Sequence, residues 1–143
     1  MDETLTGKVA LVTGGAKRVG AAICRRLHAR GANIMLHHRA SVNEARALQI
    51  ELNAMRADSV ALIQADLLNG ASLPDLVKTT IGRFERLDIL INNASSFFPT
   101  VVGEITEKAW DDLVGTNLKA PLFLSQAAAA ELRKRHGCIV NII

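Results

Sequence analysis

The chain has 143 residues, of which 49% are hydrophobic and 22% charged, so it can bury a core and differs from a disordered protein. No apolar run approaches the ~18 residues that a membrane span needs, and the acidic N-terminus lacks the apolar segment of a signal peptide. Cys24 and Cys138 form no CxxC pair, which argues against a disulfide framework or a zinc site and favours a reducing compartment. We therefore expect one soluble, cytoplasmic domain without a metal or a membrane partner.

The net charge of +3 is a mild basic excess. Its densest stretches, 25–30 and 133–136, fall where we expect helices to end, and cations are favourable at that pole of the helix dipole. Only 3% of the residues are aromatic and none is Tyr, which leaves few platforms for stacking bases. The composition therefore disfavours a nucleic-acid partner, and remains compatible with a basic pocket for an anionic small molecule.

Short aliphatic runs alternate with longer helical patterns along the chain. The expected strands are 8–12, 33–37, 60–65, 87–92 and 138–143. The expected helices are residues 20–30 (stopped by Gly31), a helix after the capping-box pattern Ser41-Val42-Asn43-Glu44, a helix capped by Ser72, and a long stretch 106–134 loosened by Gly115 and Pro121.

The strand runs lack strict alternation of apolar and polar residues. This is typical of a parallel sheet with helices on both faces, and it predicts one doubly wound α/β domain. The last expected strand has no element after it, so we expect residues 1–143 to be part of a longer protein.

A glycine-containing turn, Thr13–Gly20, follows the first strand and leads into a helix. Glycine permits a tight turn and a close approach of the backbone to a phosphate, and the helix N-terminus offers unpaired N–H groups. The strand-turn-helix position is the context that a dinucleotide-binding turn requires. The alternative is an ordinary glycine turn.

The end of the second strand predicts the choice of cofactor. NAD-binding domains place an acid there for the ribose 2′-hydroxyl, whereas an Arg accommodates a 2′-phosphate. This chain has His37-His38-Arg39-Ala40-Ser41 and no acid before Glu44. Arg39 can pair with the phosphate and Ser41 can add hydrogen bonds, so we expect NADPH rather than NADH. The alternative for Arg39 is a solvated loop cation, and no cluster of ligands supports His37-His38 as a metal site.

Four motifs occur in a characteristic order: the Thr-Gly-x-x-x-Arg-x-Gly turn, Asp66 after the third strand, Asn92-Asn93-Ala94 after the fourth, and Asn117 in the long helix. Together they resemble the short-chain dehydrogenase/reductase family. The resemblance implies a Rossmann-type sheet. It also implies hydride transfer between a nicotinamide and a carbonyl, hydroxyl or activated double bond.

The pteridine reductase branch is similar in three further details. Arg18 replaces the middle glycine of the turn, a His-Arg pair follows the second strand, and the run 93–100 reads Asn-Ala-Ser-Ser-Phe-Phe-Pro-Thr. Such enzymes use NADPH to reduce biopterin or folate-type rings, and they are usually homotetramers. The resemblance implies that Arg18 touches the pyrophosphate and the pterin, and that Phe97 stacks on the pterin ring. The alternative is that Phe97-Phe98 anchors a loop.

The resemblance also assigns roles position by position. Asp66, with the Leu67 backbone, would hold the adenine, Asn93 and Ala94 would line the adenosine ribose, and Ser95 would lie near the phosphates and nicotinamide. The alternative for Asp66 is a helix or turn cap. The implied cofactor-binding residues are Gly14, Lys17, Arg18, Val19, Gly20, His38, Arg39, Ala40, Ser41, Asp66, Leu67, Asn93, Ala94 and Ser95. The implied substrate-binding residues are Arg18, Ser95 and Phe97.

Asn117 is the catalytic residue that the resemblance implies, because the family's helix asparagine kinks the helix and holds a water of the proton relay. A buried Asn in a helix interior must also satisfy its amide. The family's Tyr-x-x-x-Lys would lie beyond residue 143, and the chain contains no Tyr. We therefore expect residues 1–143 alone to be inactive. The alternatives are a 3-ketoacyl or sugar-type carbonyl reductase and a short NADP-binding module without catalysis.

Overall fold

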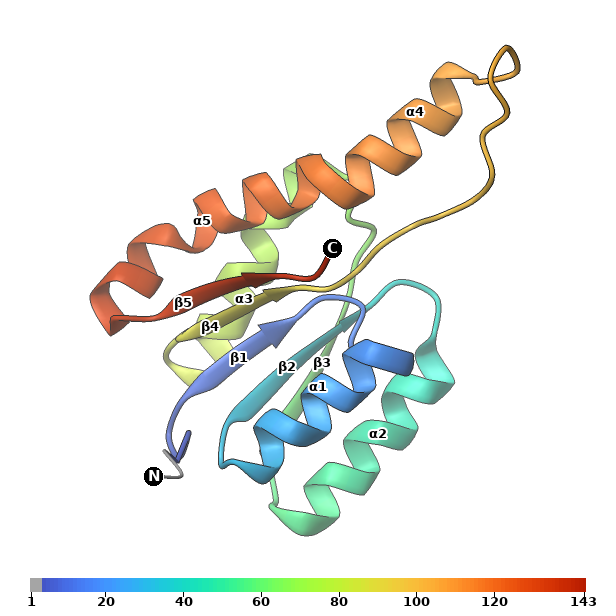
Figure 1. The fold of residues 1–143 in the computed structure, drawn as a ribbon. Coiled ribbons are helices and arrows are strands. Elements are labelled where there is room, and N and C mark those ends of the chain that lie inside the picture. The colour runs from blue at the N-terminus through green and yellow to red at the C-terminus, as the bar shows by residue number, and fades with distance from the viewer. Residues whose placement is uncertain (1–3) are drawn as a thin grey trace.

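The computed structural model describes residues 4–143, in which five strands form one parallel sheet (Figure 1). The strands are β1 (Val9–Val12), β2 (Asn33–His38), β3 (Val60–Gln64), β4 (Ile89–Asn92) and β5 (Cys138–Asn141). Their order is β3-β2-β1-β4-β5, and every neighbouring pair is parallel. This is the strand order of a Rossmann-type sheet, so the predicted fold class is confirmed.

The helices cover both faces of the sheet. They are α1 (Arg18–Ala29), α2 (Val42–Met55), the 3-10 turn η1 (Gly70–Ser72), α3 (Leu73–Phe84), α4 (Glu107–Val114), the π-helical turn η2 (Gly115–Lys119) and α5 (Ala120–Arg135). Helices α1 and α2 lie on one face, α3 and α5 on the other, and α4 projects beyond the sheet (Figure 1). Among residues 4–143, no helix is both long and apolar enough to cross a membrane.

The core has two apolar layers, one on each side of the sheet. Successive strand residues point to opposite faces, and because helices cover both faces, consecutive apolar residues fill β1, the middle of β2 and the start of β4. All four residues of β1 are buried. The layer under α1 and α2 includes Ala10, Val12, Ile34, Leu36, Cys24, Leu48 and Leu52. The layer under α3 and α5 includes Leu11, Met35, Leu90, Leu76, Leu124 and Leu132.

The expected elements all form, but two predicted helix caps are wrong. Ser41 lies at a tight turn in which Val42 N–H donates to Ala40 O (2.9 Å), and its backbone (φ −82°, ψ 57°) is not the extended conformation of a capping serine. Its hydroxyl caps no backbone N–H of the described chain. Ser72 is the last residue of η1, and its hydroxyl donates back to Asn69 O (2.8 Å) rather than capping α3. The predicted stop at Gly31 is confirmed, with φ +102°.

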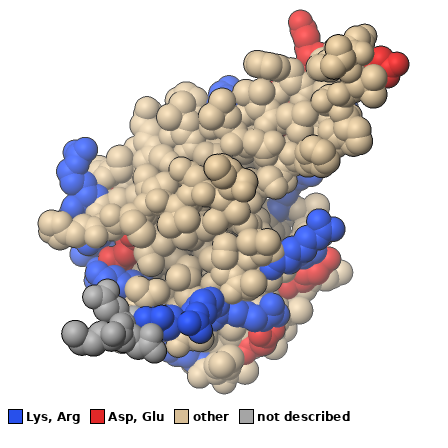
Figure 2. All heavy atoms as spheres, in the orientation of Figure 1, with Lys and Arg blue, Asp and Glu red and all other residues tan. Residues whose placement is uncertain are grey.

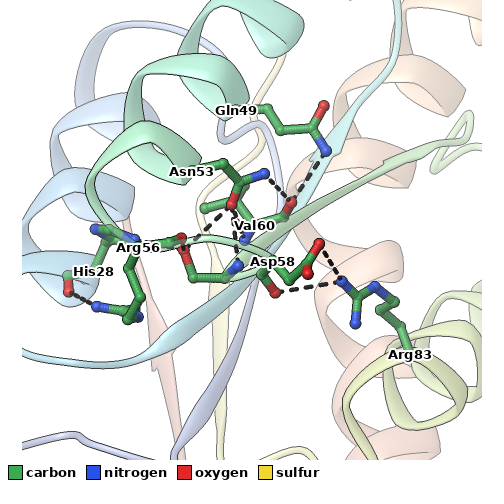
Figure 3. A network of polar contacts seen from close by, with 8 residues as sticks. His28, Gln49, Asn53, Arg56, Asp58, Val60 and Arg83 are labelled. Atoms are coloured by element: carbon green, nitrogen blue, oxygen red, sulfur yellow. Dashed lines mark hydrogen bonds and ion pairs between the residues drawn. The ribbon is translucent and has the colours of Figure 1, made fainter.

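Side-chain hydrogen bonds tie the C-terminal end of α2 to the start of β3 (Figure 3). Asn53 Oδ1 accepts from the N–H groups of Ser59 (3.0 Å) and Val60 (2.9 Å), and Asn53 Nδ2 donates to Val60 O (3.1 Å). The guanidinium of Arg56 donates to the carbonyls of His28 (3.0 Å) and Ala32. The network lies at the amino ends of the strands, whereas the glycine turn lies at their carboxyl ends. It therefore stabilises the fold without touching the candidate site.

Asp88, only 2% exposed, stabilises the same amino-terminal end of the sheet. It accepts from Val9 N–H (2.9 Å) and from two nitrogens of Arg86 (2.8 and 2.6 Å), and Lys8 Nζ lies 3.5 Å away. Burial raises the pKa of Asp88, but these donors and charges together hold it below the ordinary value of 3.8.

We expect Asp88→Asn to lower the free energy of unfolding by about 1–2 kcal/mol at neutral pH, because Arg86 and Lys8 lose their buried anion. A carboxyl with a depressed folded-state pKa stabilises the fold above its unfolded pKa, and this contribution disappears as the pH falls through the folded pKa. The difference between wild type and variant, measured by urea unfolding at several pH values, therefore shrinks as the pH falls below 3.8. A difference that is independent of pH would contradict this role.

Candidate functional site

The candidate site lies at the carboxyl ends of β1, β2 and β4. Strand β1 has β2 on one side and β4 on the other, so the loops after these strands diverge at this point (Figure 1). Open α/β sheets bind ligands in the crevice at such a switch point. The turn Thr13–Gly20, the loop after β2 and the loop after β4 all reach it.

Two glycines of the turn are required by close packing. Gly14 has φ +60°, and a Cβ there would lie 3.0 Å from Ala94 Cα. A Cβ on Gly20 would lie 2.1 Å from Gly14 O and 2.7 Å from Asn93 Nδ2. The carbonyl of Gly14, the first turn of α1 and the loop after β4 are therefore in direct contact, and no larger residue fits between them.

Thr13 and Asn93 join the turn to the loop after β4. Thr13 Oγ1 accepts from the N–H groups of Asn93 and Ala94, both at 3.0 Å. Asn93 Nδ2 donates to the carbonyls of Thr13 (3.0 Å) and Gly14 (3.2 Å). The structure therefore uses the amide nitrogen of Asn93 to brace the turn. Thr13 lies in the predicted turn but has no predicted role of its own, and its hydroxyl is what fixes the start of the loop after β4.

The N-terminus of α1 is open to solvent. Lys17, Arg18 and Val19 are exposed, and the first turn of the helix holds no acidic residue. Arg18 has φ +49°, a left-handed conformation that is uncommon and unfavourable for a residue with a Cβ. A helix N-terminus with two adjacent cations is suited to an anion such as a pyrophosphate.

The loop after β2 brings a cation to the same carboxyl ends of the strands. Arg39 and Ala40 are exposed and Ser41 is half-buried, and Gln64 Nε2 holds the loop by donating to Arg39 O (2.8 Å). His38 is buried, and its Nδ1 has no hydrogen-bond partner within residues 4–143. Burial, with the charge of Arg46, lowers the pKa of His38. Arg39 is thus an exposed cation at this position, and the charge of the exposed Arg46 in α2 also acts here.

The segment after β3 forms a turn. Asp66 Oδ1 accepts from Leu68 N–H (3.0 Å), so the turn-cap interpretation of Asp66 is correct for this oxygen. The carboxylate stays exposed and Leu67 is buried beneath it. Capping the turn therefore does not withdraw Asp66 from the surface.

Asn117 lies in η2, where the π-helical turn interrupts the long helix. Its Nδ2 donates to Ser96 O (2.8 Å) and its Oδ1 accepts from Ser96 N–H (3.0 Å), so the side chain holds one residue of the loop after β4 from both sides. The expectation of a buried Asn117 is wrong: the residue is exposed, and the backbone of Ser96 satisfies its amide. Ser96 Oγ also donates to Asp112 Oδ1 (2.5 Å), a contact that no sequence motif predicts.

This anchored loop presents its aromatic residues to solvent. Phe97 is 90% exposed and Phe98 37%, while Ser95 is exposed next to them. Phe97 therefore does not anchor the loop to the described part of the chain. The face in Figure 2 shows few charged side chains over β4 and β5, whereas Lys and Arg, with Asp and Glu among them, lie over α1 and α2.

Comparison with known proteins gives consistent results. A family profile described as short chain dehydrogenase matches residues 8–143. Pteridine reductase 1 of Leishmania tarentolae is 38% identical over the whole chain, which covers 63% of that protein. A 3-oxoacyl-(acyl-carrier-protein) reductase, FabG, of Staphylococcus aureus is 34% identical over 94% of the chain, which covers 55% of that protein.

A crystal structure supports the same relationship. The blue fluorescent protein from a metagenomic library, in complex with NADPH, superimposes with a TM-score of 0.91 at 38% identity. The alignment covers 96% of this chain and 56% of the fluorescent protein, so the chain spans little more than half the length of these relatives. With the profile matching nearly all of its residues, the chain belongs to the short chain dehydrogenase family.

Proposed function

We propose that the protein is an NADPH-dependent reductase and that residues 1–143 are its cofactor-binding part. The observation that carries this proposal is the braced glycine turn, which sets the exposed Lys17 and Arg18 at the N-terminus of α1. Such an end binds the pyrophosphate of a dinucleotide. The NADPH complex of the similar fluorescent protein supports the same choice of ligand.

The preference for NADPH over NADH rests on the loop after β2. In the turn of the loop, the exposed Arg39 stands where an NAD-binding domain has an acid, and the next acid is Glu44 inside α2. A guanidinium pairs with a 2′-phosphate through charge-assisted hydrogen bonds that a 2′-hydroxyl cannot match. The backbone of Ala40 and the hydroxyl of Ser41 would complete the contact with the 2′-phosphate.

We expect Arg39→Asp to raise the Kd for NADPH by about 30-fold and the Kd for NADH by less than about threefold, because only NADPH loses an ion pair and gains a like charge. Fluorescence titration with both nucleotides measures the two constants. Arg133→Asp, at the exposed end of α5, is the control with the same change of charge. Equal losses for both nucleotides would show that Arg39 does not recognise the 2′-phosphate.

We further propose that the substrate is a dihydropterin or a related folate-type ring. Two features support this: Arg18, an arginine in a left-handed position, and the exposed Phe97 on a loop that Asn117 anchors. A flat heteroaromatic ring gains ~0.5–1.5 kcal/mol from aromatic stacking beyond the area it buries. The similarity to pteridine reductase 1 agrees. The second candidate is reduction of a 3-oxoacyl thioester, because the staphylococcal reductase is nearly as similar.

Phe97→Ala tests the choice between these substrates. We expect it to raise the KM for dihydrobiopterin by about fivefold, through lost stacking, with little effect on the reduction of an acetoacetyl thioester. Val102→Ala, at a 91% exposed position of the same loop, is the matched control. If the variant impairs both reductions equally, or neither, Phe97 does not recognise a pterin.

We propose that the proton donor and the residues that activate it lie outside residues 1–143, as the resemblance implies. We also propose a cytoplasmic homotetramer. It would form through the helical arm α4-η2-α5, which exposes large apolar side chains that a partner subunit would cover: Trp110, Leu118, Leu122 and Phe123. Sedimentation of the protein as its gene encodes it tests the oligomeric state.

A further inference from the structure

His37, the fifth residue of β2, is 1% exposed and lies beneath the glycine turn. Its backbone carbonyl accepts from Gly15 N–H (2.9 Å). Its Nδ1 accepts from Gly14 N–H (3.1 Å), and its Nε2 lies 2.9 Å from Ala65 O. One residue therefore connects the turn after β1 with the end of β3.

These contacts select one form of the imidazole. The N–H of Gly14 requires a lone pair on Nδ1, and the carbonyl of Ala65 requires a proton on Nε2. Only the neutral ring protonated at Nε2 satisfies both, because an imidazolium would direct a second N–H at the N–H of Gly14. Burial lowers the pKa of His37 and His38 lowers it further, against the opposing effects of the Ala65 bond and Asp66. The ring is therefore neutral at neutral pH.

The Thr13–Gly14 peptide unit is thus held at both of its polar ends. Its N–H, from Gly14, donates to His37 Nδ1, and its C=O, from Thr13, accepts from Asn93 Nδ2 (3.0 Å) on the opposite side. Gly14, at φ +60°, follows this peptide directly, and its own carbonyl is the atom that limits the size of residue 20. The orientation of this one peptide consequently fixes the path of the turn into α1.

We propose that His37 is a positioning residue for cofactor binding: with Asn93 it clamps the Thr13–Gly14 peptide and holds the glycine turn in its binding shape before the ligand arrives. This inference rests on the proposed function, in which the turn receives the pyrophosphate. Because Gly14 N–H is committed to His37, the donors offered to the phosphates come from the later part of the turn and from α1. A turn that is ordered in advance spares the ligand the entropic cost of ordering it.

Two substitutions separate the two ring nitrogens. In His37→Asn, Oδ1 takes the place of Nδ1 and can accept from Gly14 N–H, but the side chain is too short to reach Ala65 O. In His37→Gln, the longer amide reaches Ala65 O, and Nδ1 has no counterpart. We expect the Asn variant to bind NADPH within about threefold of wild type and the Gln variant to bind about tenfold more weakly, the loss of roughly one buried hydrogen bond.

His28→Gln is the control for buried histidines in general. His28 is also buried, and its Nε2 forms a hydrogen bond with Ser59 Oγ (2.7 Å). This contact lies at the amino ends of the strands, away from the glycine turn. We expect His28→Gln to lower the melting temperature and to leave the Kd for NADPH unchanged. Equal affinity of the Asn and Gln variants of His37, or a loss of affinity in His28→Gln of the same size, would overturn the proposal.

A second readout needs no ligand. Long-range nitrogen NMR of the full chain reports which imidazole nitrogen carries the proton, and hydrogen exchange reports the protection of the Gly14 amide. We expect a His37 ring protonated at Nε2, and a Gly14 amide that is protected in wild type and His37→Asn but not in His37→Gln. The other tautomer would overturn the inference. Failure of the wild type to bind NADPH, with the clamp intact by NMR, would instead refute the proposed function.

Discussion

Gly20→Ala is expected to abolish measurable NADPH binding, raising the Kd by more than about 100-fold. The new Cβ would lie 2.1 Å from Gly14 O and 2.7 Å from Asn93 Nδ2, so the peptide that carries the Gly14 carbonyl must move. This displacement also breaks the hydrogen bond from Asn93 Nδ2 to Gly14 O. Overpacking of this kind costs about 1–3 kcal/mol of stability, which urea unfolding measures beside the nucleotide titration.

Gly82→Ala is the matched control for this substitution. Gly82 lies in α3, exposed to solvent, and apart from the nearby backbone of its own helix no described atom lies within 4 Å of an added Cβ. Alanine is the better helix former by about 1 kcal/mol, so this variant gains stability and keeps its affinity for NADPH. If the Gly20→Ala protein binds NADPH as tightly as the Gly82→Ala protein does, the glycine turn is not part of the binding site.

Asn53→Ala is expected to have the largest effect on stability, lowering the free energy of unfolding by about 3 kcal/mol. The substitution leaves the N–H groups of Ser59 and Val60 without their acceptor at the start of β3, and it removes one of two donors to Val60 O (Figure 3). The midpoint of urea unfolding measures the loss. Because the network lies far from the glycine turn, the Kd for NADPH of the folded protein does not change.

Two further variants separate the donor and acceptor contributions of the Asn53 side chain to stability. Gln49→Ala removes only the other donor to Val60 O (3.0 Å), and we expect a loss of about 1 kcal/mol. Asn53→Asp keeps an acceptor for the two N–H groups and loses the donor, so its stability falls between those of wild type and Asn53→Ala. If Gln49→Ala were as damaging as Asn53→Ala, the acceptor role of Asn53 would be wrong.

The fold could be predicted from the sequence because its signals are local. Strands buried on both faces are rich in consecutive apolar residues, as β1 and the first three residues of β4 are, and a glycine after a strand marks the turn into α1. The helix stop at Gly31 follows from the left-handed conformation that glycine adopts most readily. The motif positions around Gly14 and Asn93 likewise come together in space, since both follow neighbouring strands of the sheet.

The failed caps depend on local backbone geometry, whereas the other unpredicted features are contacts between residues far apart in the sequence. The pattern at Ser41 predicts a capping hydroxyl, but the tight turn before α2 changes the backbone conformation on which that cap depends. Asn117 was expected to be buried, whereas it reaches 21 residues back to the backbone of Ser96. No pattern within β2 indicates that His37 accepts from Gly14 N–H, because that contact depends on how the turn folds over the strand end.

The most direct test of the account follows the absorbance of NADPH while the protein, as its gene encodes it, is offered dihydrobiopterin and an acetoacetyl thioester in parallel. We predict oxidation of NADPH with dihydrobiopterin at a kcat/KM at least about tenfold above that with the thioester, a difference of about 1.4 kcal/mol in transition-state stabilisation. Reduction of the thioester alone would contradict the pterin assignment and favour a carbonyl reductase. Tight binding of NADPH with no oxidation by either substrate would contradict the reductase itself.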